Sequence, residues 1–298
     1  MTPTPRVGPM FRYPRAAAEV TVPDGSPLES AVARTTDLGI GAHQDDLEFM
    51  ALVGIAACRD DPDRWFTGVA CTDGAGSART GPYAECSDDE MMAIRRAEQR
   101  AAAEIGGNSA VFQLGHPSLA IRGEHHAELV AELAEILAVA RPVNVYTHNL
   151  ADKHATHVAT GAATVEALRS LPPDQRPWKV VGVEGWRGLD WLDDDEKVLL
   201  DASGLDDLAA RLAAVFDSQI AGGKRYDLAE QGRRRANATL LAPRHVDEAS
   251  ELTFALDLTP LVHNVELDPV TFVVAAIDRF RDDVVSSLRT YFPTSTPD

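Results

Sequence analysis

Two short stretches of the sequence contain the residue types that bind divalent metal ions. The first is Ala42-His43-Gln44-Asp45-Asp46-Leu47-Glu48, and the second is Asp152-Lys153-His154-Ala155-Thr156-His157. Each comes shortly after an apolar run. Imidazole nitrogens and carboxylate oxygens suit Zn²⁺, and a set of His, Asp and His leaves the fourth position for water. Together the two stretches predict a catalytic metal site.

The spacing within each stretch supports this prediction. His43 and Asp46 are three residues apart, and so are His154 and His157 at the start of an expected helix, where both rings can lie on one face. Asp45 precedes Asp46, and adjacent helical residues point about 100° apart. Asp45 can therefore miss the metal and accept a proton from the bound water, whose pKa a metal lowers to about 7.

Each stretch also has a simpler explanation. An Asp-Asp pair after a strand is often a helix N-cap that faces the positive end of the helix dipole. A histidine pair three residues apart more often lies on a surface or in polar packing. Because both stretches follow predicted strands of one sheet, the metal site is the better explanation of the two together.

The elements that must position these residues alternate along the chain. Apolar runs predict strands at 38–42, 65–71, 110–114, 143–147 and 179–184. Helical spacing predicts helices at 46–58, 87–105, 124–140 and 155–170. This alternation is typical of a Rossmann-like α/β fold, a mostly parallel sheet with helices on both faces. Ligands of such sheets bind at the carboxyl ends of the strands, where both stretches fall.

The two ends of the chain are less regular. Residues 1–35 are expected to form an irregular leader, and 251–258 and 270–291 a further strand and a closing helix. No linker or shift in composition marks a second domain. We therefore expect a single domain over residues 1–298, with a core at about 36–190 and a substrate-shaping C-terminal part at about 191–298.

Composition excludes several classes of function. The 298 residues include 46 Asp and Glu but only 28 Lys and Arg, a net charge of −18 that repels nucleic acid and anionic membranes. The longest apolar run, 49–58, has ten residues and is too short to cross a bilayer. The N-terminal residues lack the apolar core of a signal peptide, so we expect a cytoplasmic protein.

The two stretches resemble the A-H-P-D-D-x-E and D-x-H-P-D-H motifs of the PIG-L/LmbE family of zinc-dependent N-acetylglucosamine deacetylases. Thr72-Asp73-Gly74 and Ile94-Arg95-Arg96-Ala97-Glu98 resemble the family's intermediate blocks, so the resemblance covers about residues 36–170 in the right order. Gln44 stands where the family usually has Pro, and Ala155-Thr156 replaces its Pro-Asp.

The resemblance implies a role for each matched residue. His43, Asp46 and His157 would bind one Zn²⁺ per chain, with Fe²⁺ as the alternative metal. Asp45 would be the general base that activates the water. His154 would protonate the leaving amine or support the oxyanion.

Two more residues of the motifs would act by orientation. Asp152 would hold His154 in its tautomer and orientation, an arrangement common around metal-binding imidazoles. Glu48 would be a further orienting carboxylate, bonded to backbone at the helix start.

Four residues outside the motifs are expected at the substrate: Asp73 and Arg79 on the loop after the second strand, and Arg225 and Tyr226 closing over it. Their simpler explanations are an exposed loop charge and a solvated basic turn.

Other residues of suitable type are left out of the site. We expect His125 and His126 on a surface, and His116 has no visible partner in the sequence. His148, Trp186 and Trp191 are open between lining the pocket and packing.

These observations predict a metal-dependent hydrolase that removes an N-acetyl group from an N-acetylglucosamine-type glycoconjugate. Its partner would be a small N-acetylated amino sugar, not nucleic acid or membrane, and a homo-oligomer stays open. One alternative is another metal-assisted hydrolase on the same fold, acting on a phosphoester or a different amide. The other is a metal-free Rossmann-like binding module, which the absence of GxGxxG after the first strand disfavours.

Overall fold

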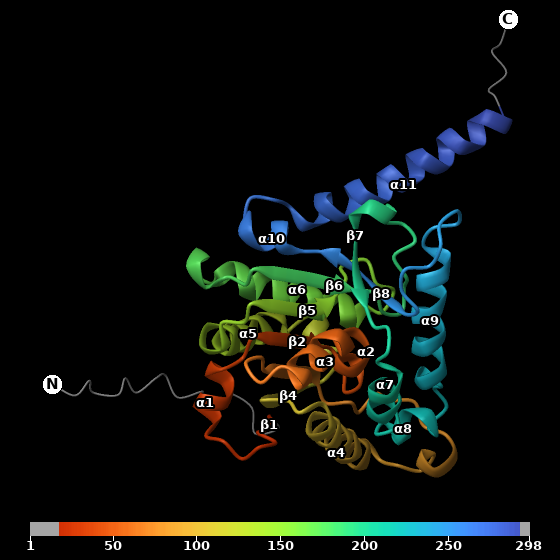
Figure 1. Ribbon diagram of the computed structural model, residues 1–298. Coiled ribbons are helices and arrows are strands. Elements are labelled where there is room, and N and C mark those ends of the chain that lie inside the picture. The colour runs from red at the N-terminus through yellow and green to blue at the C-terminus, as the bar shows by residue number, and fades with distance from the viewer. Residues whose placement is uncertain (1–17, 293–298) are drawn as a thin grey trace, which may run out of the picture.

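One eight-stranded sheet forms the centre of the computed structural model, which describes residues 18–292 (Figure 1). Its strands, in spatial order, are β1 (Glu19–Thr21), β4 (Ala110–His116), β3 (Phe66–Thr72), β2 (Asp37–Gly41), β5 (Asn144–His148), β6 (Lys179–Val183), β8 (Leu252–Asp257) and β7 (Lys197–Asp201). The five strands from β4 to β6 run parallel to one another, whereas β1 is antiparallel to β4 and β8 is antiparallel to both of its neighbours. The predicted fold class is confirmed.

Helices cover both faces of this sheet. One apolar core lies under α1 (Leu28–Ala33), α5 (His126–Ala140), α6 (Ala155–Ser170) and α10 (Thr259–His263). The other lies under α2 (Asp46–Met50), α3 (Leu52–Asp60), α4 (Asp88–Gly106) and α7 (Asp206–Ala213). All residues of β2, β3 and β4 are buried, as expected of strands covered on both faces.

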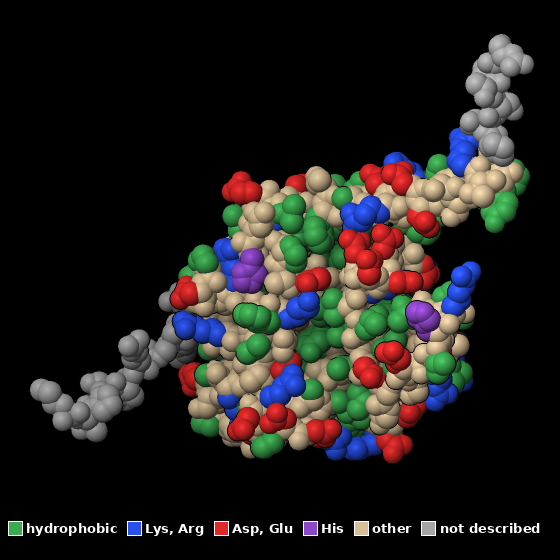
Figure 2. All heavy atoms as spheres, turned by 45° about the horizontal axis from the view of Figure 1, so that its top comes forward, with side chains coloured by type: hydrophobic (Ala, Val, Ile, Leu, Met, Phe, Trp, Pro, Cys, Tyr) green, Lys and Arg blue, Asp and Glu red, His purple; other side chains and the backbone are tan. Residues whose placement is uncertain are grey.

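The remaining helices lie toward the edges. They are α8 (Asp217–Ile220), α9 (Tyr226–Leu240) and α11 (Pro269–Tyr291), with short 3₁₀ helices η1 (Gly81–Tyr83), η2 (Ala120–Arg122), η3 (Pro173–Gln175) and η4 (Asp194–Glu196). In Figure 1, α11 runs out from the body at the upper right, and Figure 2 shows apolar side chains on its outer end. Within residues 18–292 the structure contains no helix that is both long and apolar enough to span a bilayer.

The longest helix of the core, α4, has clear signals at both ends. The Ser87 hydroxyl accepts the Glu90 N–H at 3.3 Å, and the Glu90 carboxylate accepts the Ser87 N–H at 2.8 Å, which completes a capping box. At the other end Gly107 has φ 68°, the left-handed conformation that commonly ends helices.

The sequence-based prediction was wrong in three places. Residues 18–35 are not irregular, since they contain β1 and α1; residues 1–17 lie outside the described part. The predicted helix 46–58 is divided into α2 and α3 at Ala51, which has φ −112° and ψ 18°. The edge strand β7 was not predicted, because its residues are largely accessible and it forms by pairing with β8.

Candidate metal centre

The candidate residues meet where the strand order changes direction. From β2 the chain goes on to β3 on one side, whereas β5 lies on the other side of β2. His43 and Asp46 follow β2, and His154 and His157 begin α6 after β5. Open parallel sheets bind their ligands in the crevice at such a point.

His43, Asp46 and His157 form a group that can hold a metal ion, with ligand atoms all within 4.8 Å of one another. Asp46 Oδ2 lies 3.3 Å from His43 Nδ1, and Asp46 Oδ1 lies 3.4 Å from His157 Nε2. Two ligands of tetrahedral zinc at about 2.0–2.1 Å are roughly 3.3 Å apart, so both separations fit a shared ion. Burial would raise the pKa of Asp46, but the imidazoles of His157 and His148 hold it well below its usual range.

Asp152 orients His157, not His154 as predicted. Asp152 Oδ2 accepts a hydrogen bond from His157 Nδ1 at 2.8 Å, which leaves His157 Nε2 facing Asp46. The reason is local geometry. His157 lies in the first turn of α6 and helical side chains tilt toward the N-terminus, whereas His154 is the extended N-cap residue.

Backbone groups hold Asp152 in place. The N–H groups of Lys153, Trp186 and Arg187 donate to its carboxylate at 2.6, 3.2 and 2.8 Å. Burial would raise the pKa of Asp152, but the His157 imidazole and the N–H groups of Lys153 and Arg187 lower it to about 2. A Cβ at Gly185 would come within 2.6 Å of Asp152 Oδ2, so the close approach of this loop requires glycine.

The sequence does not decide whether His148, at the end of β5, lines the pocket or only packs. In the structure it lies inside the site. Its Nε2 accepts the Ala42 N–H at 2.9 Å, and its ring stacks on His157 with centroids 3.9 Å apart. Burial and the neighbouring His157 lower the pKa of His148 to about 4. The same Nε2 lies 3.2 Å from Asp46 Oδ2, so His148 contacts a candidate ligand as well as the ring of His157. With Asp152 and His157 it forms a second, overlapping group that could hold a metal ion.

Asp45 is held in an unusual conformation beside the metal group. It has φ 91°, its N–H donates to Gln99 Oε1 at 3.2 Å, and its Oδ2 lies 3.1 Å from Arg95 Nη2. Burial raises the pKa of Asp45 to about 6, against the opposing charge of Arg95.

The sequence did not predict that Arg95 and Gln99 contact Asp45. The ion pair between Arg95 and Glu98 is present at 3.4 Å, but Arg95 also contacts Asp45 and donates to the Gln44 carbonyl. The signal was available, since Arg95 and Gln99 are polar and four residues apart on the face of α4 that becomes buried.

The Glu48 carboxylate contacts its own backbone N–H, and its side-chain partner lies on α4. Its Oε1 accepts Gln99 Nε2 at 2.8 Å, while Oε2 is buried with no hydrogen-bond partner among the described residues. Burial raises the pKa of Glu48 to about 8.

His154 lies on the open side of the group. Its ring packs edge-on against His43, with centroids 5.1 Å apart, and lies 6.0 Å from the Trp186 ring. Its Nδ1 has no hydrogen-bond partner among residues 18–292. Burial and the neighbouring imidazoles lower the pKa of His154 to about 4, so the ring is neutral near pH 7.

Aromatic side chains continue from His154 along one side of the site. Tyr226 lies 6.1 Å from Trp186 and 6.0 Å from Phe49, both in edge-to-face geometry. Burial, with Asp45 and Asp46 nearby, raises the pKa of the Tyr226 phenol. Trp191, whose role the sequence also left undecided, is buried in the apolar core.

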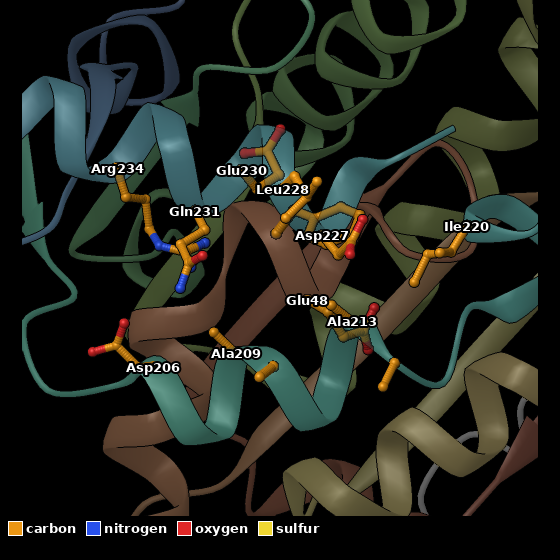
Figure 3. A pocket seen from close by; sticks show the side chains of 13 residues that line it. Glu48, Asp206, Ala209, Ala213, Ile220, Asp227, Leu228, Glu230, Gln231 and Arg234 are labelled. Carbon is orange, nitrogen blue, oxygen red and sulfur yellow. The ribbon is translucent and has the colours of Figure 1, made fainter. Parts of the chain in front are cut away.

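A cavity of about 220 Å³ adjoins this aromatic side between α2, α7 and α9 (Figure 3). Glu48 and Phe49 connect it to the metal group. Its other lining residues are mostly alanines and acidic side chains: Asp206, Ala209, Ala210, Ala213, Ala214, Ile220, Asp227, Leu228, Glu230, Gln231 and Arg234.

Of the four predicted substrate contacts, Tyr226 lies in the aromatic side of the site. Arg79 donates to Ala75 O and to Asp88 on α4, and the exposed Arg225 pairs with Asp227. Asp73 accepts the Ala75 N–H at 3.0 Å. The contacts of the described residues do not join Asp73, Arg79 or Arg225 to the metal group, and their roles stay predictions.

Comparisons with known proteins agree with the fold and the motifs. Residues 38–168 match the family model PIG-L, described as GlcNAc-PI de-N-acetylase. No curated protein matches the sequence.

Solved structures share the architecture at low identity. The conserved protein TT1542 from Thermus thermophilus is 19% identical with a TM-score of 0.59, covering 75% of this chain and 94% of its own. GalB, the 4-carboxy-2-hydroxymuconate hydratase from Pseudomonas putida, is 18% identical with a TM-score of 0.56, covering 75% and 96%. N,N'-diacetylchitobiose deacetylase from Pyrococcus horikoshii is 17% identical with a TM-score of 0.57, covering 78% and 86%.

The fold and the crevice thus define a Rossmann-like α/β protein with a candidate His-Asp-His metal centre. Residues 38–168, which contain both motifs, match the PIG-L family model.

Proposed function

We propose that this protein is a metal-dependent N-deacetylase that releases acetate from N-acetylglucosamine-type glycoconjugates. The observation that carries the proposal is the meeting of His43, Asp46 and His157 in one crevice with Asp45 beside them. The match of residues 38–168 to the PIG-L family model and the deacetylase named among the similar folds support it.

The donor set fits the metal that the family implies. His43, Asp46 and His157 would hold Zn²⁺ or Fe²⁺, and the Asp152 contact leaves His157 Nε2 available as a ligand. When bound, such a metal polarises the substrate carbonyl and acidifies a water molecule.

The neighbouring side chains supply the proton transfers. Asp45 is fixed by Arg95 and Gln99 and serves as the general base toward the attacking water. Neutral His154 donates a hydrogen bond to the developing oxyanion, and the proton taken up by Asp45 goes to the leaving amine. His154 is suited to this role because its ring lies against that of the candidate ligand His43.

The surroundings of the crevice favour a sugar as substrate. Trp186 and Tyr226 offer aromatic surface on which the apolar face of a sugar ring can pack. Next to them, the carboxylates of Glu230 and Asp227 line the cavity and can accept hydrogen bonds from hydroxyl groups. A small amino-sugar conjugate uses both kinds of surface.

A substrate panel with an acetate readout tests this function. The metal-loaded protein should release acetate from N-acetylglucosamine conjugates, and an exposed-site control, Asp60→Asn on α3, should do so equally well. Phosphate release from p-nitrophenyl phosphate, or hydration of an unsaturated acid, with no acetate from any conjugate would overturn it. The hydration arm matters because the hydratase GalB shares the fold.

A further inference from the structure

A second group of metal-binding side chains lies at the end of β4 and shares no residue with the crevice group. His116 ends β4, His125 is the N-cap residue of α5, and Glu128 is in the first turn of α5. Their ligand atoms all lie within 4.8 Å of one another. Sequence reasoning placed His125 on a surface and gave His116 no partner; the connection 117–124 folds back and brings them together.

The hydrogen bonding of His116 prepares one of its nitrogens for a ligand. Nε2 lies 2.6 Å from Glu132 Oε2, one turn along α5 from Glu128. A carboxylate at this distance holds the proton on Nε2, so Nδ1 keeps a free lone pair. His116 is fully buried, and its Nδ1 has no hydrogen-bond partner among the described residues. Buried polar atoms without a protein partner are rare, and a bound ion is one established reason for them.

This arrangement contains both candidate metal ligands and a carboxylate that orients one of them. Metal-binding histidines usually donate their second N–H to a carboxylate, which sets the tautomer and orients the ring. Here Glu132 has that place behind His116, while two imidazoles and the Glu128 carboxylate supply the donor types found in His₂Glu zinc sites. His116 and Glu132 are buried, whereas His125 and Glu128 are half-buried, so solvent can reach the group from one side.

The group is separate from the proposed catalytic centre. Strand β3 lies between β4 and β2 in the sheet, and Glu132 belongs to α5, which covers the face opposite α2. None of the four residues belongs to the crevice group.

We propose that His116, His125 and Glu128 bind a second divalent transition-metal ion, with Zn²⁺ the best match, and that Glu132 positions His116 for it. The ion links the end of β4 to the start of α5 and so fixes the connection 117–124.

Metal counting in a background without the first site tests the proposal. A His43→Ala, Asp46→Ala variant, dialysed against Zn²⁺ and measured by elemental analysis, should retain one equivalent per chain. Adding Glu128→Gln or His125→Ala should remove it. The matched control is His126→Ala, the neighbouring histidine that bonds Glu166 instead, and it should keep the equivalent. Substitution with Co²⁺ should give visible absorption of a tetrahedral site in the control and not in Glu128→Gln.

Zinc binding unchanged by both Glu128→Gln and His125→Ala, or no equivalent in the background variant, would overturn the second site. Circular dichroism identifies a variant that has not folded, and Glu128→Gln keeps the size of the side chain so that one folded variant remains. Failure of the proposed deacetylation is a different result. Glu128→Gln in the otherwise unchanged chain should keep its acetate release with one metal equivalent fewer.

Discussion

Asp45 has a backbone conformation that the surrounding side chains impose on it. It has φ 91°, a region that residues with a Cβ rarely adopt, and it is held there by Gln99 at its N–H and Arg95 at its carboxylate. Such conformations cost about 1–3 kcal/mol and persist where the surroundings determine them. The position directs a carboxylate toward the crevice at the expense of stability.

Substitution at Asp45 should therefore separate backbone strain from side-chain loss. Both Asp45→Gly and Asp45→Ala remove the carboxylate, but glycine accepts positive φ, so the glycine variant should be about 1 kcal/mol more stable to unfolding in urea. At Glu135, an exposed position in the middle of α5, the order should reverse because glycine is the poorer helix former. Equal stability of the two Asp45 variants would show that the backbone there is not strained.

At the scale of elements, α4 supplies the side chains that hold Asp45 and Glu48 in place. Arg95 and Gln99 on this helix contact Asp45 and Glu48, and Glu98 accepts the Ser218 N–H and hydroxyl at 2.7 and 2.6 Å. The capping box at Ser87 starts the helix two turns before these contacts.

Removal of that cap should weaken the fold without changing the chemistry. Ser87→Ala should lower the free energy of unfolding by about 1 kcal/mol, because the Glu90 N–H loses its acceptor. Acetate release per folded molecule should stay unchanged, since the substitution leaves Arg95 and Gln99 intact. A control, Ser286→Ala at an exposed position inside α11, should not destabilise. If Ser87→Ala unfolded at the same urea concentration as the wild type, the cap would not be stabilising α4.

The sequence was sufficient for elements with strong periodicity and clear end signals. The helix predicted at 155–170 is α6 with the same bounds, and the cap at Ser87 lies where expected. By contrast, β1 has three half-buried residues and β7 is partly exposed, so pairing with β4 and β8, not local pattern, decides their structure.

In the candidate site, too, some contacts could be predicted from the sequence and others could not. The meeting of His43, Asp46 and His157 could be expected, because their motifs follow two strands of one parallel sheet. The contact between Arg95 and Asp45 could not, since it joins segments fifty residues apart through the packing of α4. Asp152 was assigned to the wrong histidine because the choice depends on the side-chain directions at one helix start.

At the scale of the whole molecule, the C-terminal part places further elements beside the candidate metal centre. It adds β8 and β7 to the sheet, and α7 and α9 form the cavity beside Glu48 (Figure 3). The N-terminal residue of α9, Tyr226, packs near Phe49 from α2 and Trp186 from the loop after β6. Residues outside the matched segment 38–168 therefore shape the surroundings of the candidate metal centre.

The most direct test of the account measures metal content and acetate release on the same preparations of three proteins. Asp45→Asn should keep the metal content of the wild type and lose turnover by about 10²–10⁴-fold, because it removes the base but none of the ligands. His43→Ala should contain one metal equivalent fewer than the wild type and release no acetate. Wild-type turnover in Asp45→Asn, or an unchanged metal content in His43→Ala, would contradict the account.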